Sequence, residues 1–470
     1  MSLLNTDPLL ERIREGRRLT RRDQLWLTVG LSLPAIVAQV AGVLLQYIDA
    51  AMVGHLGAEA SASIGLVSTS IWMLGGLCGA VATGFTVQVA HRVGANDMEG
   101  ARDVLRQATL VGAAVGMLFS AVGIAIHGAL PAWLGGEEAI CADASAYFLI
   151  YSVAVPFLLL SHMGSGMLRC AGNVRVPSVA AVVMCVLDVC FNYLFIYACG
   201  WGVAGAAWGT FTAELLTAGF TWWYIARRSP ELRGFWRPAA AARAPSPFAL
   251  TGFTLRRAWA IGSPIGLERV VTTSAQIVTT MILAPLGAAA IAAHSFGITI
   301  EALCYMPGYG IEEAATTLVG QSIGARRYEL TKRFAWLCVG LGVGVMTVMG
   351  AVMWVGAPAM MSFITPVEEV IALGTEALRI EAWAEPGFAA AIVCYGCMVG
   401  AGDTFIPACL NFGSMWLIRI TLALLLTNYF GLGLRGVWIA MAVELCLRGL
   451  FFLIRLRWGR WMKPKSDARA

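Results

Sequence analysis

Three acidic residues lie inside long apolar segments of the first half of the sequence: Asp49, Asp188 and Glu214. A carboxyl group in such a segment can bind and release a proton or hold a cation, because no basic residue lies beside it in the same segment. Asn192 follows Asp188 by four residues, so the amide and the carboxyl share one face of a helix. With Thr210 on the next segment, these residues predict a group that exchanges protons or cations: Asp49, Asp188, Asn192 and Thr210.

The composition decides which class of protein carries this group. The chain has 470 residues, of which 58% are hydrophobic and 13% are charged, and its mean hydropathy is +0.72. Soluble domains carry about 25% charged residues, so a soluble multidomain enzyme is excluded. Gly and Pro are dispersed through apolar runs, which excludes a disordered chain. The apolar stretches are long enough for membrane helices and lack the short alternation of a β-barrel. We therefore expect an all-α polytopic membrane protein.

Twelve segments are long and apolar enough to cross a membrane. They are residues 24–53, 59–90, 103–127, 143–163, 172–198, 203–226, 258–284, 290–319, 334–357, 369–395, 404–428 and 434–456. If the amino terminus is cytoplasmic, 28 of the 33 Lys and Arg residues lie on the cytoplasmic side and only Arg435 lies outside. Membrane proteins show this positive-inside asymmetry. Both termini are therefore predicted to be cytoplasmic.

With this topology, the depth of the polar residues follows from the helix rise. Asp188, Asn192 and Thr210 lie about 15, 9 and 12 Å from the outer ends of their helices, and Asp49 is somewhat shallower. All four are expected in the outer half of one lobe.

Residues that interrupt helices recur at a fixed spacing of 230 positions. Pro34, Pro156 and Pro177 match Pro264, Pro386 and Pro407, and Gly94-Ala95 matches Gly324-Ala325. An Arg- and Pro-rich linker separates the two copies. The expected organisation is a cytoplasmic segment 1–23, an N-lobe 24–226, a linker 227–257, a C-lobe 258–456 and a cytoplasmic tail 457–470.

Each copy holds six spans, an even number, so the two copies enter the membrane in the same sense. Two six-helix repeats related by an axis along the membrane normal are typical of alternating-access transporters, which bind substrate between the repeats. A membrane receptor built on a duplicated scaffold is an alternative, but a receptor needs no such symmetry.

The sequence shows no pattern typical of a metal site or of an enzyme active site. The twelve Cys show no metal-site spacing with the five His, which are isolated from one another, and no nucleophile triad or phosphate loop is present. We therefore expect no enzyme, no metal, no cofactor and no nucleic-acid partner. The amino terminus shows no cleavable signal pattern.

An ordered set of motifs resembles the multidrug and toxic compound extrusion (MATE) family. The motifs are Leu33-Pro34, YIDAAMVGHLG at 47–57, VAHRVGA at 89–95, LRCAGN at 168–173, GVAGAAW at 202–208, TLVGQSIGA at 317–325 and GAGDT at 400–404. The resemblance covers residues 24 to 456. It implies a secondary antiporter that exports bulky, often cationic amphipaths in exchange for H⁺ or Na⁺.

The resemblance also assigns roles to residues of the first half. Asp49 stands where the family has its acidic coupling residue, Asp188 and Asn192 fall on a polar pair of the fifth helix, and Thr210 falls on a threonine of the sixth. Proton-coupled bacterial members commonly have Asn before Asp, and here the order is reversed. Two acidic positions of the sodium-coupled members are Thr272 and Phe388 here, which weakens coupling to Na⁺.

The second half holds several acidic residues among basic ones. The candidate substrate-binding residues are Glu214, Glu268, Glu301, Glu312, Glu313 and Glu385. Several acids of this half can instead form internal ion pairs, with Arg269, Arg379, Arg419 and Arg448 as partners. Glu312 and Glu313 stand where the family has small residues, so they either face a cation or pair with the cytoplasmic arginines.

The predicted function is a drug/H⁺ antiporter of the inner (plasma) membrane, monomeric in the lipid bilayer, that exports monocationic aromatic amphipaths. Acidic groups together with aromatic and Met side chains suit such substrates. A Na⁺-coupled drug antiporter and a lipid-linked precursor flippase are the alternatives. A flippase would need cationic partners for a pyrophosphate head group, and the spans of the first half have few.

Overall fold

The computed structural model describes residues 6–236 and 248–462, and within these ranges all regular secondary structure is helical. The proline-rich part of the expected linker with Pro238, Pro245 and Pro247 lies outside the described residues, as does the end of the tail. The helices of the first half are α1 (Asp7–Arg14), α2 (Arg21–Gly54), α3 (Ala58–Gly94), α4 (Met98–Ile126), α5 (Leu130–Trp133), α6 (Glu138–Ala171), α7 (Arg175–Asn192), the π-helix η1 (Tyr193–Ala198) and α8 (Gly202–Arg227).

The second half repeats this order. Its helices are α9 (Gly252–Leu283), the 3₁₀ turn η2 (Ala284–Leu286), α10 (Ala288–Gly324), α11 (Tyr328–Ile364), α12 (Glu368–Ala382), α13 (Glu385–Gly400), α14 (Phe405–Gly413), the π-helix η3 (Ser414–Ile420), α15 (Thr421–Leu424), the π-helix η4 (Leu425–Tyr429), α16 (Gly433–Trp458) and the 3₁₀ turn η5 (Arg460–Met462). Helices α3 and α10 have the same bounds shifted by 230 residues, and Asn96 and Arg326 share a left-handed backbone with φ of 59° and 56°. The predicted repeat is therefore confirmed.

Nine helices or helix series of the described residues are long and apolar enough to cross a membrane, and the bent pair α12–α13 makes a tenth. The other two of the twelve expected spans are α8 and α9, which are also long helices of 26 and 32 residues. They fall short in hydropathy because α8 carries Glu214 and α9 carries Glu268, Arg269 and a run of Ser and Thr. The charged residues that are candidates for a functional site thus lower the mean hydropathy of these two helices.

The described residues form two compact units, which differ at their edges from the expected lobes. The N-terminal unit comprises Asp7–Arg17 and Ala41–Gly266, and the C-terminal unit comprises Arg18–Val40 and the chain from Leu267 onward. The first part of α2 belongs to the C-terminal unit, where Gln39 Nε2 donates to Glu313 Oε1 at 3.3 Å. The first part of α9 belongs to the N-terminal unit because Gln88 Nε2 donates to the Thr254 carbonyl at 3.2 Å.

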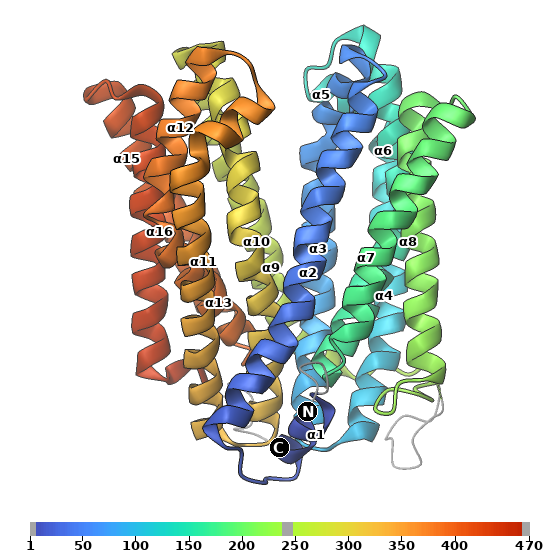
Figure 1. Ribbon diagram of the computed structural model, residues 1–470. Coiled ribbons are helices and arrows are strands. Elements are labelled where there is room, and N and C mark those ends of the chain that lie inside the picture. The colour runs from blue at the N-terminus through green and yellow to red at the C-terminus, as the bar shows by residue number, and fades with distance from the viewer. Residues whose placement is uncertain (1–5, 237–247, 463–470) are drawn as a thin grey trace. The chain divides into compact units, whose positions relative to one another are not determined.

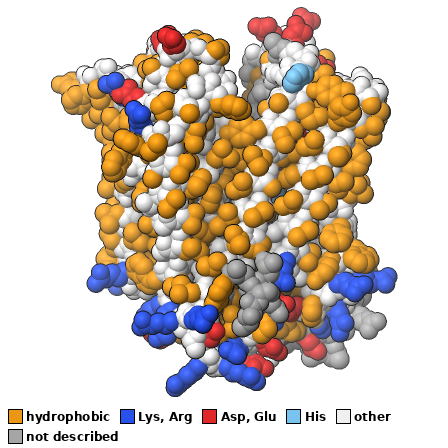
Figure 2. Space-filling view, in the orientation of Figure 1, with side chains coloured by type: hydrophobic (Ala, Val, Ile, Leu, Met, Phe, Trp, Pro, Cys, Tyr) orange, Lys and Arg blue, Asp and Glu red, His pale blue; other side chains and the backbone are white. Residues whose placement is uncertain are grey.

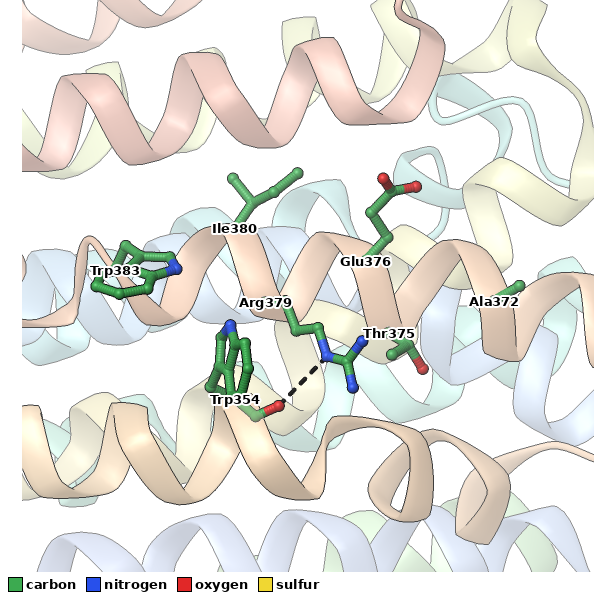
Figure 3. Close-up of a pocket in the computed structure, with 7 residues that line it drawn as sticks. All are labelled: Trp354, Ala372, Thr375, Glu376, Arg379, Ile380 and Trp383. Atoms are coloured by element: carbon green, nitrogen blue, oxygen red, sulfur yellow. Dashed lines mark hydrogen bonds between the residues drawn. The ribbon is translucent and has the colours of Figure 1, made fainter.

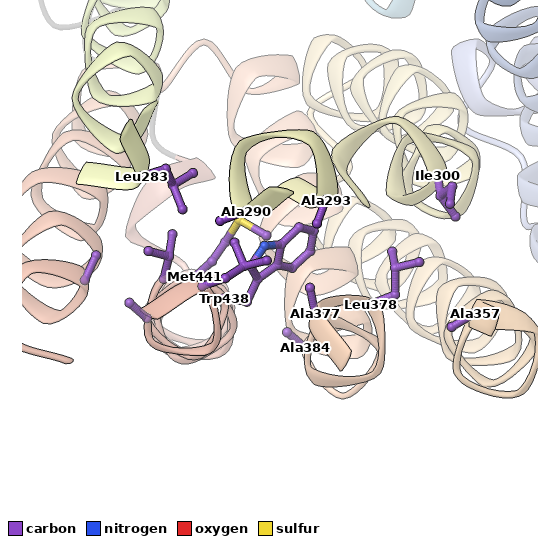
Figure 4. Close-up of a cluster of buried hydrophobic side chains, with 14 of the residues drawn as sticks. Leu283, Ala290, Ala293, Ile300, Ala357, Ala377, Leu378, Ala384, Trp438 and Met441 are labelled. Atoms are coloured by element: carbon purple, nitrogen blue, oxygen red, sulfur yellow. The ribbon is translucent and has the colours of Figure 1, made fainter. Parts of the chain in front are cut away.

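Small residues allow close helix packing in the C-terminal unit, where α11, α13 and α16 lie side by side (Figure 1). The fully buried ring of Trp438 on α16 lies among short side chains of α10, of α12 and of the bend between α12 and α13 (Figure 4), which include Ala290, Ala293, Ala377 and Ala384. Membrane helices associate through such close contacts, since lipid gives them little hydrophobic driving force. The edge of the His294 ring packs on Trp438 at a centroid distance of 5.7 Å.

The surface is that of a protein embedded in lipid. Figure 2 shows hydrophobic side chains over the middle of the visible face of each unit, with most of the visible Lys and Arg at the lower end in this view. Trp133, Phe363, Trp383 and Tyr429 are among the large exposed side chains. A soluble protein does not expose so much contiguous apolar surface.

One helix differs between the repeats. In the first half, α6 runs through Pro156 without a break, whereas α12 and α13 meet at a bend of 57° just before Pro386, the equivalent proline. A proline removes one helical hydrogen bond in both repeats. Only the second repeat has acidic residues, Glu381 and Glu385, on either side of the bend.

Candidate functional site

Asn192 joins two acidic residues of the N-terminal unit, Asp49 and Asp188. Its amide nitrogen donates to Asp49 Oδ1 at 2.9 Å and to Asp188 Oδ2 at 2.9 Å. Asp188 and Asn192 are fully buried and Asp49 is half-buried. Thr210 on α8 lies against the Asp188 carboxyl. The structure thus brings together all four residues that the sequence grouped.

The cluster has more acceptors than donors. Asp188 Oδ1 and Asn192 Oδ1 are buried, and neither has a hydrogen-bond partner within the described part of the chain. Both amide hydrogens of Asn192 are already used. A buried acceptor without a donor is costly, and a proton shared between the carboxyl groups would supply the missing donor. The arrangement therefore suits a group that gains and loses a proton.

The local sequence explains how α7 and α8 approach at this point. Gly209 packs on Asn192, and a Cβ at position 209 would overlap Asn192 Oδ1 and lie 2.8 Å from the Asn192 backbone nitrogen. The helix also changes from α to π directly after Asn192. Single π-turns inside helices occur frequently at functional sites. Sequence reasoning missed Gly209, although its place beside Thr210 was a usable signal.

Two tyrosines of α6 complete the surroundings of the acidic pair. Tyr147 and Tyr151 stack with ring centroids 6.4 Å apart, and both rings lie near Asp49 and Asp188. The sequence analysis did not single out these two tyrosines, although their four-residue spacing within an apolar span indicates that they share one face of the helix. Glu214 lies near Asp188 and interacts with Ser161 on α6. The structure thus places Glu214 beside the cluster, outside its hydrogen bonds.

In the C-terminal unit, Glu268 has two donors. The Tyr395 hydroxyl donates to Oε2 and the Asn411 amide donates to Oε1, each at 2.6 Å. Both carboxylate oxygens are therefore occupied by residues of α13 and α14.

The other candidate glutamates of this unit do not all lie beside Glu268. Glu301 and Glu385 are buried near each other, together with Glu381 at the helix bend. Glu381 Oε2 and both Glu385 oxygens lack hydrogen-bond partners within the described ranges. Glu312 lies near Glu313, Arg269 and Glu268 and packs on Gly396 of α13. The structure thus places Glu312 and Glu313 near Glu268 and Arg269, and Glu301 and Glu385 together beside the helix bend.

The expectation of internal ion pairs is confirmed for Arg419 and Arg448. The buried Glu444 carboxylate accepts from Arg419 at 2.7 Å and lies 3.2 Å from Arg448. The expectation is wrong for Arg379, because its guanidinium lies 5.3 Å over the Trp354 ring and its Nε donates to the Trp354 carbonyl, so it forms no ion pair with the nearby Glu381. Arg379 therefore makes a cation–π interaction with Trp354 in place of an ion pair.

A separate open pocket of about 500 Å³ lies between α11 and α12 (Figure 3). It is lined by Trp354, Ala372, Thr375, Glu376, Arg379, Ile380 and Trp383. None of the predicted site residues lines it. Within the described residues, no group of three or more His, Cys, Asp or Glu side chains is arranged to hold a metal ion.

The fold and the site together define a class: a polytopic helical membrane protein with two similar six-helix repeats and buried carboxyl groups in both. The family model MatE matches residues 34–194 and again residues 264–425, one match in each repeat. The chain belongs to the MatE family of transporters, as the motifs implied, and this family does not consist of enzymes.

Relatives and solved structures agree with this membership. The chain is 26% identical over 444 residues to a "Probable multidrug resistance protein NorM" of Thermotoga maritima, covering 93% of this chain and 92% of the relative. It is 28% identical over 463 residues to the protein of that name in Pseudomonas aeruginosa, covering 93% and 90%. Its fold matches a crystal structure of "MATE in complex with MaL6" with a TM-score of 0.87 at 20% identity, covering 96% and 98% of the two chains. A "MOP superfamily transporter from Pyrococcus furiosus" matches with a TM-score of 0.88 at 21% identity over the same shares.

Proposed function

We propose that the protein is a secondary antiporter that exports organic cations in exchange for H⁺ by alternating access. The names of the NorM relatives support multidrug efflux. The observation that favours protons is the shortage of hydrogen-bond donors in the cluster of Asp49, Asp188 and Asn192, where two buried acceptor oxygens have no donor within the described residues. A proton on either carboxyl would supply one such donor.

The exchange follows from the charge of the cluster. Without the proton, Asp49 and Asp188 are two carboxylates held to one amide, so their negative charges repel each other and attract a cation. With the proton, the repulsion falls and the attraction for a cation weakens. Because Asp49 is on α2 and Asp188 is on α7, this change acts between two helices. Proton entry from outside then releases the drug, and proton loss inside resets the site.

The substrate class rests on the side chains near this cluster. Tyr147 and Tyr151 offer aromatic faces, and Glu214 adds a further acidic group. Aromatic faces and carboxylates attract organic cations. We propose monocationic aromatic amphipaths as substrates, exported by a monomer in the plasma membrane with both termini in the cytoplasm.

Reconstitution into proteoliposomes tests this proposal. A fluorescent organic cation is loaded, and ΔpH and ΔNa⁺ are imposed separately. Efflux under ΔpH alone is expected. Efflux under ΔNa⁺ alone would instead establish the Na⁺-coupled alternative, and movement of lipid-linked pyrophosphate compounds only would establish a flippase.

A further inference from the structure

The open pocket between α11 and α12 contains the positive charge of Arg379. The guanidinium lies 5.3 Å over the Trp354 ring, and its Nε donates to the Trp354 carbonyl at 3.4 Å. Within the described residues, its two terminal nitrogens have no hydrogen-bond partner and the group has no ion pair. Glu376, the acidic residue of the lining, is paired with Arg435 of α16. The pocket therefore keeps one unbalanced positive charge and the terminal N–H donors of a planar guanidinium.

A second polar group of the lining also lacks a partner. Thr375 lies one helical turn before Arg379, so the two residues share a face of α12, and both side chains point toward α11 in Figure 3. The Thr375 hydroxyl is buried and makes no hydrogen bond within the described part of the chain. A buried hydroxyl without a partner is costly. An anion held by Arg379 would give this hydroxyl an acceptor.

The pocket lies at the depth of a lipid headgroup. At 1.5 Å per residue, Trp354 is about 32 Å from Arg333 along α11, and Arg435 is about 30 Å from Arg455 along α16. The hydrocarbon core of a bilayer is about 30 Å thick, so basic residues at one border place the pocket at the other. Trp side chains concentrate at these borders, and Trp354 and Trp383 are 43% and 78% exposed. Under the predicted topology this border belongs to the outer leaflet.

The surface that continues from the pocket toward the middle of the membrane is apolar. Helix α11 exposes Val348, Val352 and Val355 beside Trp354. Their spacing of four and three residues puts them on one face of the helix. A ligand with a charged head and acyl chains would cover both the pocket and this face, whereas a small soluble anion would occupy the pocket alone.

From this arrangement we infer that the pocket between α11 and α12 binds the headgroup of an anionic phospholipid. The Arg379 guanidinium pairs with the phosphate through parallel hydrogen bonds, and the Thr375 hydroxyl donates to the same group. Because Arg435 pairs with Glu376, no lining carboxylate is left for the ammonium of a zwitterionic headgroup. The volume of about 500 Å³ falls within the range of about 300–1,000 Å³ that is usual for ligand pockets. Binding of this lipid does not depend on the proposed antiport.

Photo-crosslinking in nanodiscs tests this site. The purified full chain is placed in phosphatidylcholine nanodiscs with a small, non-saturating fraction of phosphatidylglycerol that carries a diazirine on one acyl chain. The same diazirine on phosphatidylcholine is the parallel probe, and labelled peptides are mapped by mass spectrometry. The α11 segment 348–355 is the expected position of the label, and the exposed Val122 of α4 is the reference for unspecific lipid contact. The variants are Arg379→Gln, Arg379→Lys and Thr375→Val, with Arg457→Gln, exposed at the opposite end of α16, as the matched control.

We expect the phosphatidylglycerol probe to label segment 348–355 more strongly than the phosphatidylcholine probe does. Arg379→Gln should reduce this label at least about tenfold, because it removes charge-assisted hydrogen bonds to the phosphate. Arg379→Lys keeps the charge without the planar fork and should lose less, and Thr375→Val should also lose less. Arg457→Gln should leave the label on the segment unchanged, and the label at Val122 should be the same in all variants.

Equal labelling of the segment by the two probes in the wild-type protein, or an unchanged label in Arg379→Gln, would overturn the assignment. Competition identifies the source of the phosphate. Unlabelled phosphatidylglycerol should displace the probe, whereas displacement by soluble glycerol 1-phosphate at the same concentration would show a site for a soluble anion and exclude the lipid. If Arg379→Gln does not fold, the losses in Arg379→Lys and Thr375→Val decide the matter. Since the label is measured without transport, failure of the proposed antiport would leave this result unaffected.

Discussion

In the second repeat, the Asn411 amide on α14 donates to the Glu268 carboxylate on α9. In the first repeat, the Asn192 amide on α7 donates to the Asp49 carboxylate on α2, and these are the equivalent two helices. In both pairs the two residues are 143 positions apart. The residues of the second pair nevertheless follow those of the first pair by 219 positions, whereas the repeat spacing is 230. The second pair therefore lies 11 residues, or about 16 Å, nearer the start of its helices. The positions equivalent to Glu268 and Asn411 are Ala38 and Ala181. Each repeat therefore has its own acid–amide contact, at a different depth.

Asp49 is predicted to be the main coupling carboxyl. Asp49→Asn keeps an oxygen that accepts from Asn192, so the protein should fold, but it cannot exchange a proton. Efflux driven by ΔpH in proteoliposomes is expected to fall to the level of empty liposomes, and Asp188→Asn should be less severe because Asn192 remains on that face. Asp143→Asn, at an exposed position of α6, is the control. Wild-type efflux in Asp49→Asn would make Asp49 a structural residue.

Gly209→Ala is predicted to damage the cluster through sterics alone. The added Cβ overlaps Asn192 Oδ1, and overpacking of this kind costs about 1–3 kcal/mol. Gly219 lies on the same helix, and a Cβ added there would meet no atom of a neighbouring helix within 4 Å, so Gly219→Ala should stabilise the helix by up to about 1 kcal/mol. Thermal unfolding in detergent and ΔpH-driven efflux should both separate the two variants. If both variants had the same Tm and the same efflux rate, Asn192 would adjust to the added Cβ without loss of stability or transport, which would contradict the prediction.

Tyr395→Phe is predicted to destabilise the C-terminal unit. It removes one of the two donors to Glu268, and hydrogen bonds to charged groups contribute about 1.5–3 kcal/mol. The Tm in detergent should fall, whereas Tyr429→Phe, at a hydroxyl on a ring that is 80% exposed, should leave it unchanged. An unchanged Tm in both variants would show that the Glu268 contact carries no net stability.

Glu444→Gln is predicted to be the most destabilising of these substitutions. It leaves Arg419 and Arg448 without their shared buried carboxylate, and breaking a buried pair costs about 3–5 kcal/mol. Glu376→Gln breaks the partly exposed pair with Arg435, which is worth less than about 1 kcal/mol. Denaturation midpoints of the two variants in the same detergent measure the difference. A smaller loss for Glu444→Gln than for Glu376→Gln would contradict the assignment.

The predicted topology is tested by labelling introduced cysteines in a cysteine-free background. Ser246→Cys, in the part of the linker outside the described residues, should react with an impermeant reagent only from the cytoplasmic side. Glu137→Cys, at an exposed position just before α6, should react in intact cells. Reaction of Ser246→Cys in intact cells would reverse the orientation.

The sequence by itself determined the fold class and the residues of the first cluster. Twelve apolar segments and the 230-residue repeat depend on local composition and chain order, and an acidic residue in an apolar span is visible wherever it lies. Asp188 and Asn192 were joined correctly because a helix places residues four apart on one face.

Only the tertiary structure decided which distant side chains meet. Tyr147, Tyr151 and Gly209 approach the acidic pair through the packing of α6, α7 and α8. The contacts of Glu268 with Tyr395 and Asn411, and the preference of Arg379 for Trp354 over Glu381, depend on how α9, α11, α12, α13 and α14 pack. Contacts across helices depend on the rotation and depth of each helix, and no spacing along the chain encodes these two quantities.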